Sequence, residues 1–245
     1  MKAFEKKTDM DILITGASRG IGAELAKKLA ESKHKLLLLS RNTERLNDVT
    51  TQCKELYNNH LVYPITFDLA KLEDNKDELI DKISAITNQI DVLVNNAGYL
   101  INKPFLKIDR EDEMAMFQTN YFAPALLTRT LFSFIKRSKH SSIINIATMG
   151  AVQGASKFSG LATYSASKAA LVTLTECLAE EFKEFRIRAN ALAIGAVDTE
   201  MFNEAFPGID AGTTPEEMAE FIKWFVEEGY KRFNGKLIPV SDSTP

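Results

Sequence analysis

A short apolar run, a glycine-rich turn and a helix-forming segment follow one another near the start of the chain. The apolar run Asp11–Thr15 leads directly into Gly16-Ala-Ser-Arg-Gly-Ile-Gly22, and residues 23–30 are strong helix formers with apolar positions at helical spacing. Glycines let a backbone approach a phosphate closely, and a helix N-terminus offers unpaired N–H groups to it. The spacing G-x-x-x-G-x-G differs from the common G-x-G-x-x-G fingerprint. An ordinary glycine-rich turn is the alternative, but the flanking strand and helix favour nucleotide binding.

Apolar and helix-forming segments alternate along the rest of the chain without a linker. The pattern predicts strands at residues 35–40, 61–67, 90–94, 142–147, 188–193 and 236–240, and helices at 43–57, 73–88, 111–136, 164–184 and 215–228. Pro64 predicts that its strand lies near an edge of the sheet, or that the proline lies near the start of the strand. Pro124 predicts a kink nearby in the long helix. We therefore expect one doubly wound α/β domain over residues 1–245, with a mostly parallel sheet and a loop or short helical lid at about 198–214.

Composition restricts the partners that such a domain would have. The 245 residues carry a formal net charge of −3, so no basic surface argues for nucleic acid or for an anionic membrane. No apolar run is long enough to span a membrane, and the charged N-terminus lacks the apolar region of a signal peptide. Cys53 and Cys177 are far apart and indicate reduced thiols in a cytoplasmic protein. The three histidines are scattered, so we expect no metal site.

Small and polar residues follow the predicted strands, where a doubly wound sheet binds its ligands. These segments are Ser40-Arg41, Asp68-Leu69, Asn95–Gly98, Thr148 and Gly195. An acidic residue after the second strand usually accepts from the ribose of NAD, whereas an arginine accommodates the 2′-phosphate of NADP. Arg41 therefore favours NADP, and Arg19 in the glycine turn is a second candidate clamp. The alternative for either arginine is a solvated surface charge.

Tyr164 and Lys168 are four residues apart on a predicted helix and so lie on one face of it. An ammonium beside a phenol favours the phenolate, which predicts a lowered pKa for Tyr164 and a general acid/base role. Taken alone, such a pair is more often an exposed pair on a helix surface. Asn120 lies inside the predicted helix 111–136, where asparagine competes for backbone hydrogen bonds. It has either a specific role there or a solvent-facing position.

The order and spacing of these motifs resemble the short-chain dehydrogenase/reductase family over nearly the whole chain. The motifs are Thr15–Gly22, Asp68, Asn95–Gly98, Asn120, Tyr164-x-x-x-Lys168 and Gly195-x-Val-Asp-Thr199. The resemblance implies a Rossmann-type fold with a seven-stranded sheet, a nicotinamide cofactor and a homodimer or homotetramer. The cofactor contacts that it implies are Gly16, Ser18, Arg19, Gly20, Ile21, Gly22, Ser40, Arg41, Asp68, Leu69, Asn96, Ala97, Gly98, Tyr164, Lys168, Val197 and Thr199.

The resemblance also implies roles for individual residues. Tyr164 corresponds to the residue that gives a proton to the carbonyl oxygen, or takes one from an alcohol, and Lys168 to the one that holds the nicotinamide ribose and lowers the tyrosine pKa. Asn120 corresponds to the helix residue that positions a water near the lysine. Asp68 with Leu69 corresponds to the adenine contacts, residues 96–98 to the ribose side, and Val197 with Thr199 to the carboxamide contacts.

Three positions depart from the family pattern. The serine that usually orients the carbonyl corresponds best to Thr148, although the longer loop before Tyr164 brings Ser156 and Ser159 into question for the same role. The usual Pro-Gly after the sixth strand is Ile194-Gly195, which predicts a less rigid turn. The C-terminal tail is short, as is the lid, and lacks the common Asp-Gly-Gly, which predicts an open substrate site.

The expected activity is hydride transfer from NADPH to the carbonyl of a ketone, an aldehyde or a 3-oxoacyl group. Two alternatives stay open at this point. One is a catalytically weak NADP(H)-binding sensor or scaffold, which the threonine at position 148 suggests. The other is oxidation of an alcohol, which the preference for NADP argues against.

Overall fold

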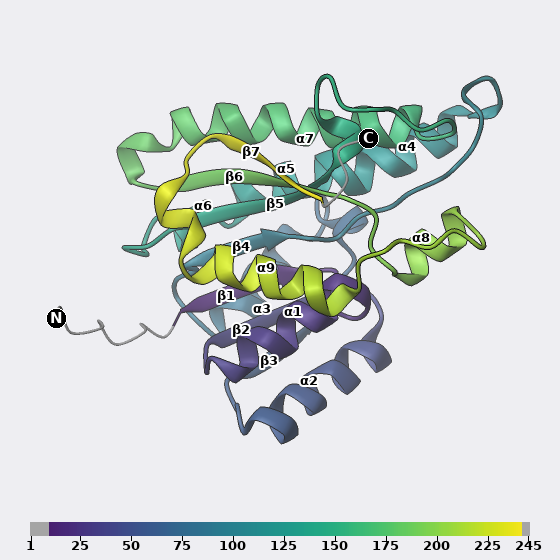
Figure 1. The fold of residues 1–245 in the computed structure, drawn as a ribbon. Coiled ribbons are helices and arrows are strands. Elements are labelled where there is room, and N and C mark those ends of the chain that lie inside the picture. The colour runs from purple at the N-terminus through teal and green to yellow at the C-terminus, as the bar shows by residue number, and fades with distance from the viewer. Residues whose placement is uncertain (1–9, 242–245) are drawn as a thin grey trace, which may run out of the picture.

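Seven strands form a single sheet in which every neighbouring pair is parallel, in the order β3-β2-β1-β4-β5-β6-β7 (Figure 1). The computed structural model describes residues 10–241. The strands are β1 (Asp11–Thr15), β2 (Lys35–Ser40), β3 (Val62–Thr66), β4 (Val92–Asn95), β5 (Ser142–Thr148), β6 (Arg188–Ile194) and β7 (Lys236–Val240). The predicted doubly wound Rossmann-type α/β fold is confirmed.

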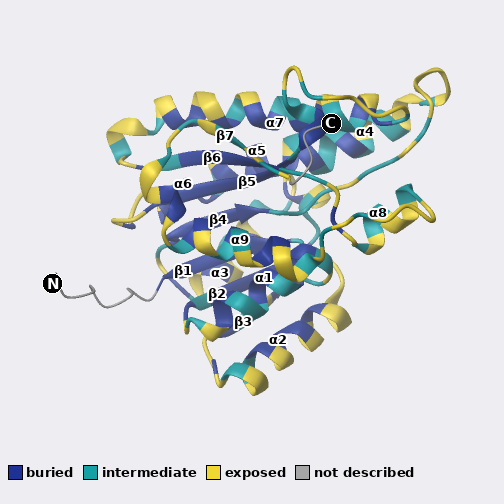
Figure 2. Cartoon of the chain, viewed as in Figure 1, coloured by how far each residue is buried: buried dark blue, intermediate teal, exposed yellow. Residues whose placement is uncertain are grey.

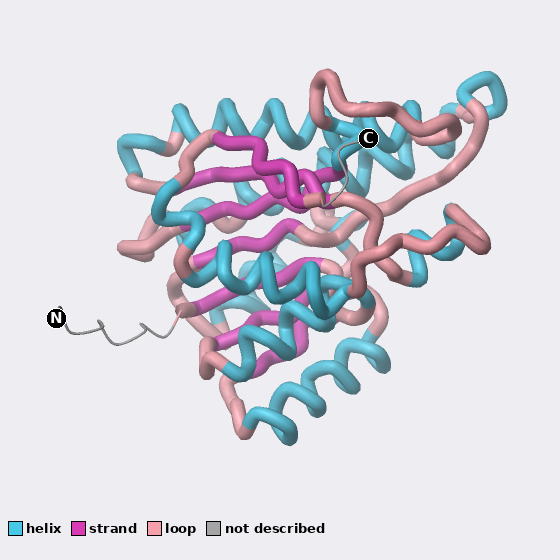
Figure 3. Tube along the Cα trace, in the orientation of Figure 1, coloured by secondary structure: helices cyan, strands magenta, loops and turns pink. Residues whose placement is uncertain are grey.

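Helices cover both faces of the sheet (Figure 3). They are α1 (Gly20–Glu31), α2 (Thr43–Tyr57), α3 (Lys76–Ser84), α4 (Arg110–Phe117), α5 (Ala123–Thr130), α6 (Phe132–Ile135), α7 (Ala162–Glu181), α8 (Glu200–Ala205) and α9 (Pro215–Glu227). Side chains of α1, α2 and α9 share one core with Ile12 and Ile14, whereas those of α3, α5, α6 and α7 share the other with Leu13. Successive residues of a strand thus enter opposite cores, so the inner strands are buried on both faces (Figure 2).

Capping residues fix the starts of several helices. Asn42 accepts a hydrogen bond from the Arg45 N–H at 3.0 Å and caps α2. Thr214 and Glu217 form a reciprocal capping box before α9, with Pro215 at its first position. The predicted helices at 43–57 and 215–228 therefore begin where the sequence placed them.

The predicted long helix over residues 111–136 is wrong, because three helices and a π-helical turn occupy that stretch. The π turn Gln118–Phe122 separates α4 from α5, and Leu131 separates α5 from α6. Pro124 lies at the start of α5, two residues after the π turn. The predicted helix at 73–88 is also shorter, at Lys76–Ser84. The π turn contains Asn120, whose side chain bonds to Tyr99 and Ser167, and a local pattern carries no information on such distant partners.

The two edge strands of the sheet each contain a proline. Pro64 pairs in register with Leu38 in β3, and Pro239 pairs with Ala193 in β7. Both prolines are exposed. The prediction that Pro64 lies in an edge strand is confirmed. Within residues 10–241, no helix has both the length and the apolar character needed to cross a bilayer.

Candidate active site

The carboxyl end of β1 leads into the glycine turn, which packs closely against the end of β4. A Cβ on Gly22 would lie 2.3 Å from the Gly16 carbonyl oxygen, and one on Gly16, where φ is +68°, would lie 2.9 Å from Ala97 Cα. No larger residue fits at either position without a shift of the backbone. No described side chain caps the start of α1, so its N–H groups are available to a phosphate.

Asn96 joins the ends of β1 and β4. Its Nδ2 atom donates to the carbonyl oxygens of Thr15 at 3.0 Å and Gly16 at 3.3 Å. The backbone N–H groups of Asn96 and Ala97 both donate to Thr15 Oγ1 at 3.0 Å. These bonds explain the asparagine after β4 and fix residues 96–98 beside the glycine turn.

Asn120 is fully buried in the π turn and makes three hydrogen bonds. Its Oδ1 atom accepts from the Tyr99 N–H at 2.9 Å, and its Nδ2 atom donates to the Tyr99 carbonyl at 2.8 Å and to Ser167 Oγ at 2.9 Å. Ser167 Oγ in turn donates to the carbonyl of Tyr164 at 2.7 Å. The solvent-facing alternative for Asn120 is therefore wrong. The side chain ties the segment after β4 to α7.

Tyr164 and Lys168 lie one turn apart on α7, and the two differ in exposure. Tyr164 is partly exposed, whereas Lys168 is buried and its Nζ atom donates to the Ile146 carbonyl of β5 at 2.7 Å. A Cβ built on Gly98 would lie 3.4 Å from Lys168 Nζ and 3.5 Å from Asn120 Oδ1. The structure thus brings Asn120, Lys168 and the segment after β4 to one point at the carboxyl edge of the sheet.

Burial sets the pKa values of this pair. It raises the pKa of Tyr164 to about 12, because it disfavours the phenolate, and lowers the pKa of Lys168 to about 8, because it disfavours the ammonium. The expected lowering of the Tyr164 pKa by Lys168 is therefore wrong for the protein chain by itself, since desolvation acts on the phenol and raises its pKa.

Thr148 ends β5, and the two serines considered with it lie in the following loop. Its Oγ1 atom accepts from the Gly150 N–H at 3.3 Å and caps a short 3₁₀ turn at Met149–Ala151. Ser156 and Ser159 are both exposed in the loop before α7. Thr148 is thus the one of the three that lies at a strand end, where the other site residues gather.

The segment after β6 returns toward the glycine turn at residues 195–199. Gly195 is held by β7, because its N–H donates to the Val240 carbonyl at 2.9 Å and its Cβ position would be 2.6 Å from Ser241 Oγ. Val197 is buried, and Thr199 caps α8 by accepting from the Phe202 N–H at 3.2 Å. The Thr199 methyl group would meet a Cβ on Gly20 at 3.3 Å, so the residue before α8 lies directly over the glycine turn.

Two arginines near the glycine turn form ion pairs with Glu200 at the start of α8. Arg19 Nη1 pairs with Glu200 Oε2 at 2.6 Å, and Arg45 Nη1 contacts the same carboxylate at 2.9 and 3.0 Å. Arg41 is exposed at the end of β2. Sequence reasoning missed Arg45, although its place in the first turn of the helix after β2 was a usable signal.

The remaining expected cofactor contacts lie at the ends of β2 and β3. Ser40 Oγ donates to Ser18 Oγ at 2.8 Å, which joins the end of β2 to the glycine turn. Asp68 accepts from the Ala70 N–H at 3.1 Å and caps a 3₁₀ turn that begins at Leu69. Both residues of the Asp68-Leu69 pair are partly exposed, so they are accessible from solvent.

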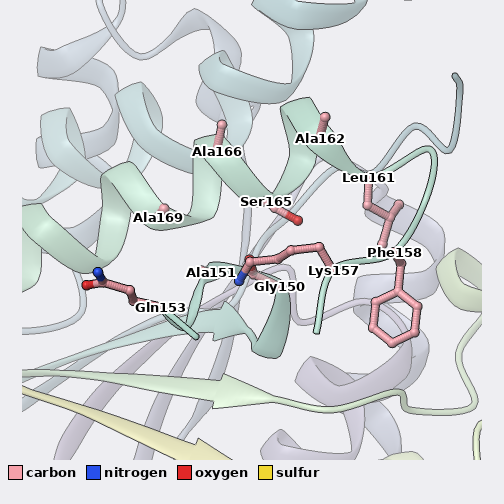
Figure 4. A pocket seen from close by; sticks show the side chains of 10 residues that line it. All are labelled: Gly150, Ala151, Gln153, Lys157, Phe158, Leu161, Ala162, Ser165, Ala166 and Ala169. Carbon is pink, nitrogen blue, oxygen red and sulfur yellow. The ribbon is translucent and has the colours of Figure 1, made fainter. Parts of the chain in front are cut away.

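A pocket of about 440 Å³ lies beside this site, between α7 and the loop that precedes it (Figure 4). Figure 4 shows α7 along one wall and the loop along the other. Its lining is Gly150, Ala151, Gln153, Lys157, Phe158, Leu161, Ala162, Ser165, Ala166 and Ala169. Lys157 Nζ closes the loop by donating to the Gly150 carbonyl at 2.9 Å. Neither Tyr164 nor Lys168 lines this pocket, so it is separate from the tyrosine–lysine pair.

A model of the short-chain dehydrogenase family matches residues 11–210, which include all of the site described above. The chain belongs to the short-chain dehydrogenase family. Within residues 10–241, no group of three or more His, Cys, Asp or Glu side chains could hold a metal ion. The part of the site that fits a dinucleotide is the glycine turn, where an added Cβ would collide with the backbone and the helix N–H groups are uncapped.

Two curated proteins illustrate the relatives of this short-chain dehydrogenase. A fatty acyl-CoA reductase from Acinetobacter baylyi is 32% identical over 90% of this chain and 74% of its own length. A 3-oxoacyl-[acyl-carrier-protein] reductase from Aquifex aeolicus is 27% identical over 94% of both chains. Among solved structures, a short-chain dehydrogenase from Shigella flexneri complexed with NADP has a TM-score of 0.88 and 27% identity, covering 96% of this chain and 99% of its own.

Proposed function

We propose that this short-chain dehydrogenase reduces a carbonyl compound with NADPH, with Tyr164 as the proton donor. The observation that carries the proposal is the convergence at the carboxyl edge of the sheet. Lys168, Asn120 and Gly98 meet there, one turn of α7 away from Tyr164 and next to the glycine turn. Ligands of doubly wound sheets bind at this edge. The bound nicotinamide supplies a hydride, and the protein supplies binding, orientation and the proton.

Each residue has a defined part in this proposal. The uncapped start of α1 binds the pyrophosphate of the cofactor, with residues 96–98 against its ribose. Lys168 holds the nicotinamide ribose, and Thr148 donates a hydrogen bond to the substrate carbonyl. Tyr164 then gives its hydroxyl proton to the carbonyl oxygen as negative charge develops there. Asn120 is a positioning residue, because its three hydrogen bonds hold α7 and the segment after β4 together.

Reduction, rather than alcohol oxidation, is supported by the relatives and by the arginines near the glycine turn. The relatives that reduce fatty acyl-CoA and 3-oxoacyl groups support a carbonyl substrate of the ketone, aldehyde or 3-oxoacyl type. Arg41 and Arg45 after β2, and Arg19 in the glycine turn, support NADPH over NADH. A homodimer or homotetramer and a cytoplasmic location stay predictions.

The first test is fluorescence titration of the purified protein with NADPH and NADH at one salt concentration, followed by turnover of a ketone, an aldehyde and a 3-oxoacyl thioester. We expect tighter binding of NADPH. Tyr164→Phe should lower kcat by about 100-fold or more while NADPH affinity stays within about twofold. If the wild type and the variant turn over every carbonyl equally slowly but bind NADPH, the sensor or scaffold alternative holds instead.

A further inference from the structure

One carboxylate of the lid lies between two arginines at the mouth of the glycine turn. Glu200, the first residue of α8, contacts Arg19 at 2.6 Å and Arg45 at 2.9 Å. Glu204, one turn further along α8, is 3.9 Å from Arg19. Arg45 and Arg19 hold the pKa of Glu200 below its usual value, so its carboxylate is ionised at neutral pH.

The two arginines come from the elements that surround the adenosine end of a bound dinucleotide. Arg19 belongs to the glycine turn, and Arg45 lies in the first turn of α2, directly after the strand end at Ser40. Ser18 and Ser40 are hydrogen-bonded at 2.8 Å between these elements. In doubly wound sheets the residues after this strand distinguish a 2′-phosphate from a 2′-hydroxyl.

We propose that Glu200 competes with the 2′-phosphate of the cofactor for Arg19 and Arg45, so that NADPH releases the start of the lid and NADH leaves it latched. This inference rests on the proposed use of NADPH. A phosphate monoester carries nearly two negative charges at neutral pH, which matches two guanidinium groups better than one carboxylate does. NADH carries no anion at that position, so it does not displace Glu200.

The rest of the lid explains why release would be local. The Asp198 N–H donates to the Thr213 carbonyl at 2.9 Å, which closes the base of the lid, and Asn102 Nδ2 donates to the Ala205 carbonyl at 2.7 Å. These bonds do not involve Arg19 or Arg45. Loss of the Glu200 contacts therefore frees the start of α8 while its far end stays attached to residue 102.

The test compares Glu200→Gln with the wild type in equilibrium binding of NADPH and NADH. The ion pairs of Glu200 with Arg19 and Arg45 are half-exposed, so each contributes little free energy. Without the competing carboxylate, NADPH should bind about 3- to 10-fold more tightly, and NADH affinity should change by less than about twofold. Glu204→Gln removes the same charge from the same helix without the close contacts, and it should change either affinity by less than about twofold. Arg45→Met should weaken NADPH binding and spare NADH.

Limited proteolysis within residues 200–204, the part of α8 that is released, gives a second readout that does not depend on activity. NADPH should speed cleavage in the wild type, NADH should not, and Glu200→Gln should be cleaved faster before any cofactor is added. If the wild type prefers NADPH but Glu200→Gln leaves the NADPH-to-NADH affinity ratio unchanged, the competition is overturned and the proposed function survives. If the wild type prefers NADH, both are overturned.

Discussion

Lys168 buries an ammonium group at the carboxyl edge of the sheet, where a hydrophobic side chain would cost less free energy. Its Nζ atom has the Ile146 carbonyl as a hydrogen-bond partner, and burial lowers its pKa to about 8. Burying a cation without a matching anion is unfavourable, so Lys168 lowers the folding stability at a position that the proposed function requires. This loss of stability is measurable through the pH dependence of folding.

Lys168→Met should remove a pH-dependent part of the folding stability. Between pH 8 and 10.5 the unfolded chain holds a proton on Lys168 that the folded chain has lost, so this residue makes stability rise with pH over that window, by up to about 3 kcal/mol. Relative to the wild type, the variant should therefore be most favoured below pH 8, and the difference should shrink toward pH 10. Urea unfolding of both proteins at pH 7 to 10 measures it.

Comparing the wild type with Lys168→Met separates the contribution of Lys168 to the pH dependence of stability from that of Cys53. Burial raises the pKa of the Cys53 thiol to about 11, which makes stability fall as pH rises through 9 to 11, but this contribution is common to both proteins. The exposed Lys183 offers a control, since Lys183→Met should run parallel to the wild type. Parallel curves for Lys168→Met as well would contradict a depressed pKa at position 168.

Thr148 should tolerate serine but not alanine. Serine keeps the hydroxyl that would orient the substrate carbonyl, so Thr148→Ser should keep kcat within about threefold, whereas Thr148→Ala should lose about 10- to 100-fold. Ser156→Ala and Ser159→Ala should stay near the wild-type kcat, because both side chains are exposed in the loop. Steady-state kinetics on one carbonyl substrate decides the case. A large loss of kcat in Ser156→Ala or Ser159→Ala, together with an active Thr148→Ala, would assign the carbonyl-orienting role to the loop serine.

At the scale of the element, the π turn Gln118–Phe122 is the clearest departure from local sequence pattern. Residues 111–136 read as one helix because their propensities and apolar spacing are helical. The interruption coincides with the bonds of Asn120 to the Tyr99 backbone and to Ser167, which are 21 and 47 residues away in sequence. A local pattern contains no information on such partners. The sequence therefore indicated that Asn120 has a specific role, but it did not predict the π turn around it.

Asn120→Ala should destabilise the protein by about 2 to 3 kcal/mol. The change removes the three hydrogen bonds of a fully buried side chain, each of which contributes about 0.5 to 1.5 kcal/mol. The midpoint of urea unfolding at pH 7 reports the loss. Asn88→Ala, at an exposed position, should change stability by less than about 0.5 kcal/mol. Equal effects of the two substitutions would refute the structural importance of the Asn120 bonds.

At the scale of the whole molecule, a large hydrophobic core lies on each face of the sheet, and Phe225 is among the largest fully buried side chains. It lies on α9, which packs on α1, and its ring stacks on Phe233 at 5.9 Å between centroids. Phe225→Ala should cost about 3 to 5 kcal/mol, because it removes a large apolar surface and leaves a cavity. Leu56→Ala, at a 69% exposed side chain, is the matched control and should cost little. Thermal unfolding of both variants measures the difference.

The architecture could be predicted from the sequence because its signals are local and repeated. Strand after strand was an apolar run followed by small or polar residues, and the order of these runs sufficed for a doubly wound sheet. For the site, the sequence predicted which strand ends lie together at the carboxyl edge of the sheet. The direction of the Tyr164 pKa shift was not predictable, because it depends on burial. The ion pairs of Arg19 and Arg45 with Glu200 were not predictable either, because they join segments that are distant in sequence.

The prolines at the two edges of the sheet bear on how copies of this protein can associate. An open sheet exposes a row of unpaired N–H and C=O groups along each outer strand, and these can template a strand from another molecule. Pro64 in β3 and Pro239 in β7 remove one donor from each row, near its middle. An incoming strand therefore meets a gap in the hydrogen-bond ladder at either edge. Self-association by sheet extension, the route toward amyloid-like stacking, is disfavoured on both sides, which leaves helices and loops as the surfaces for assembly.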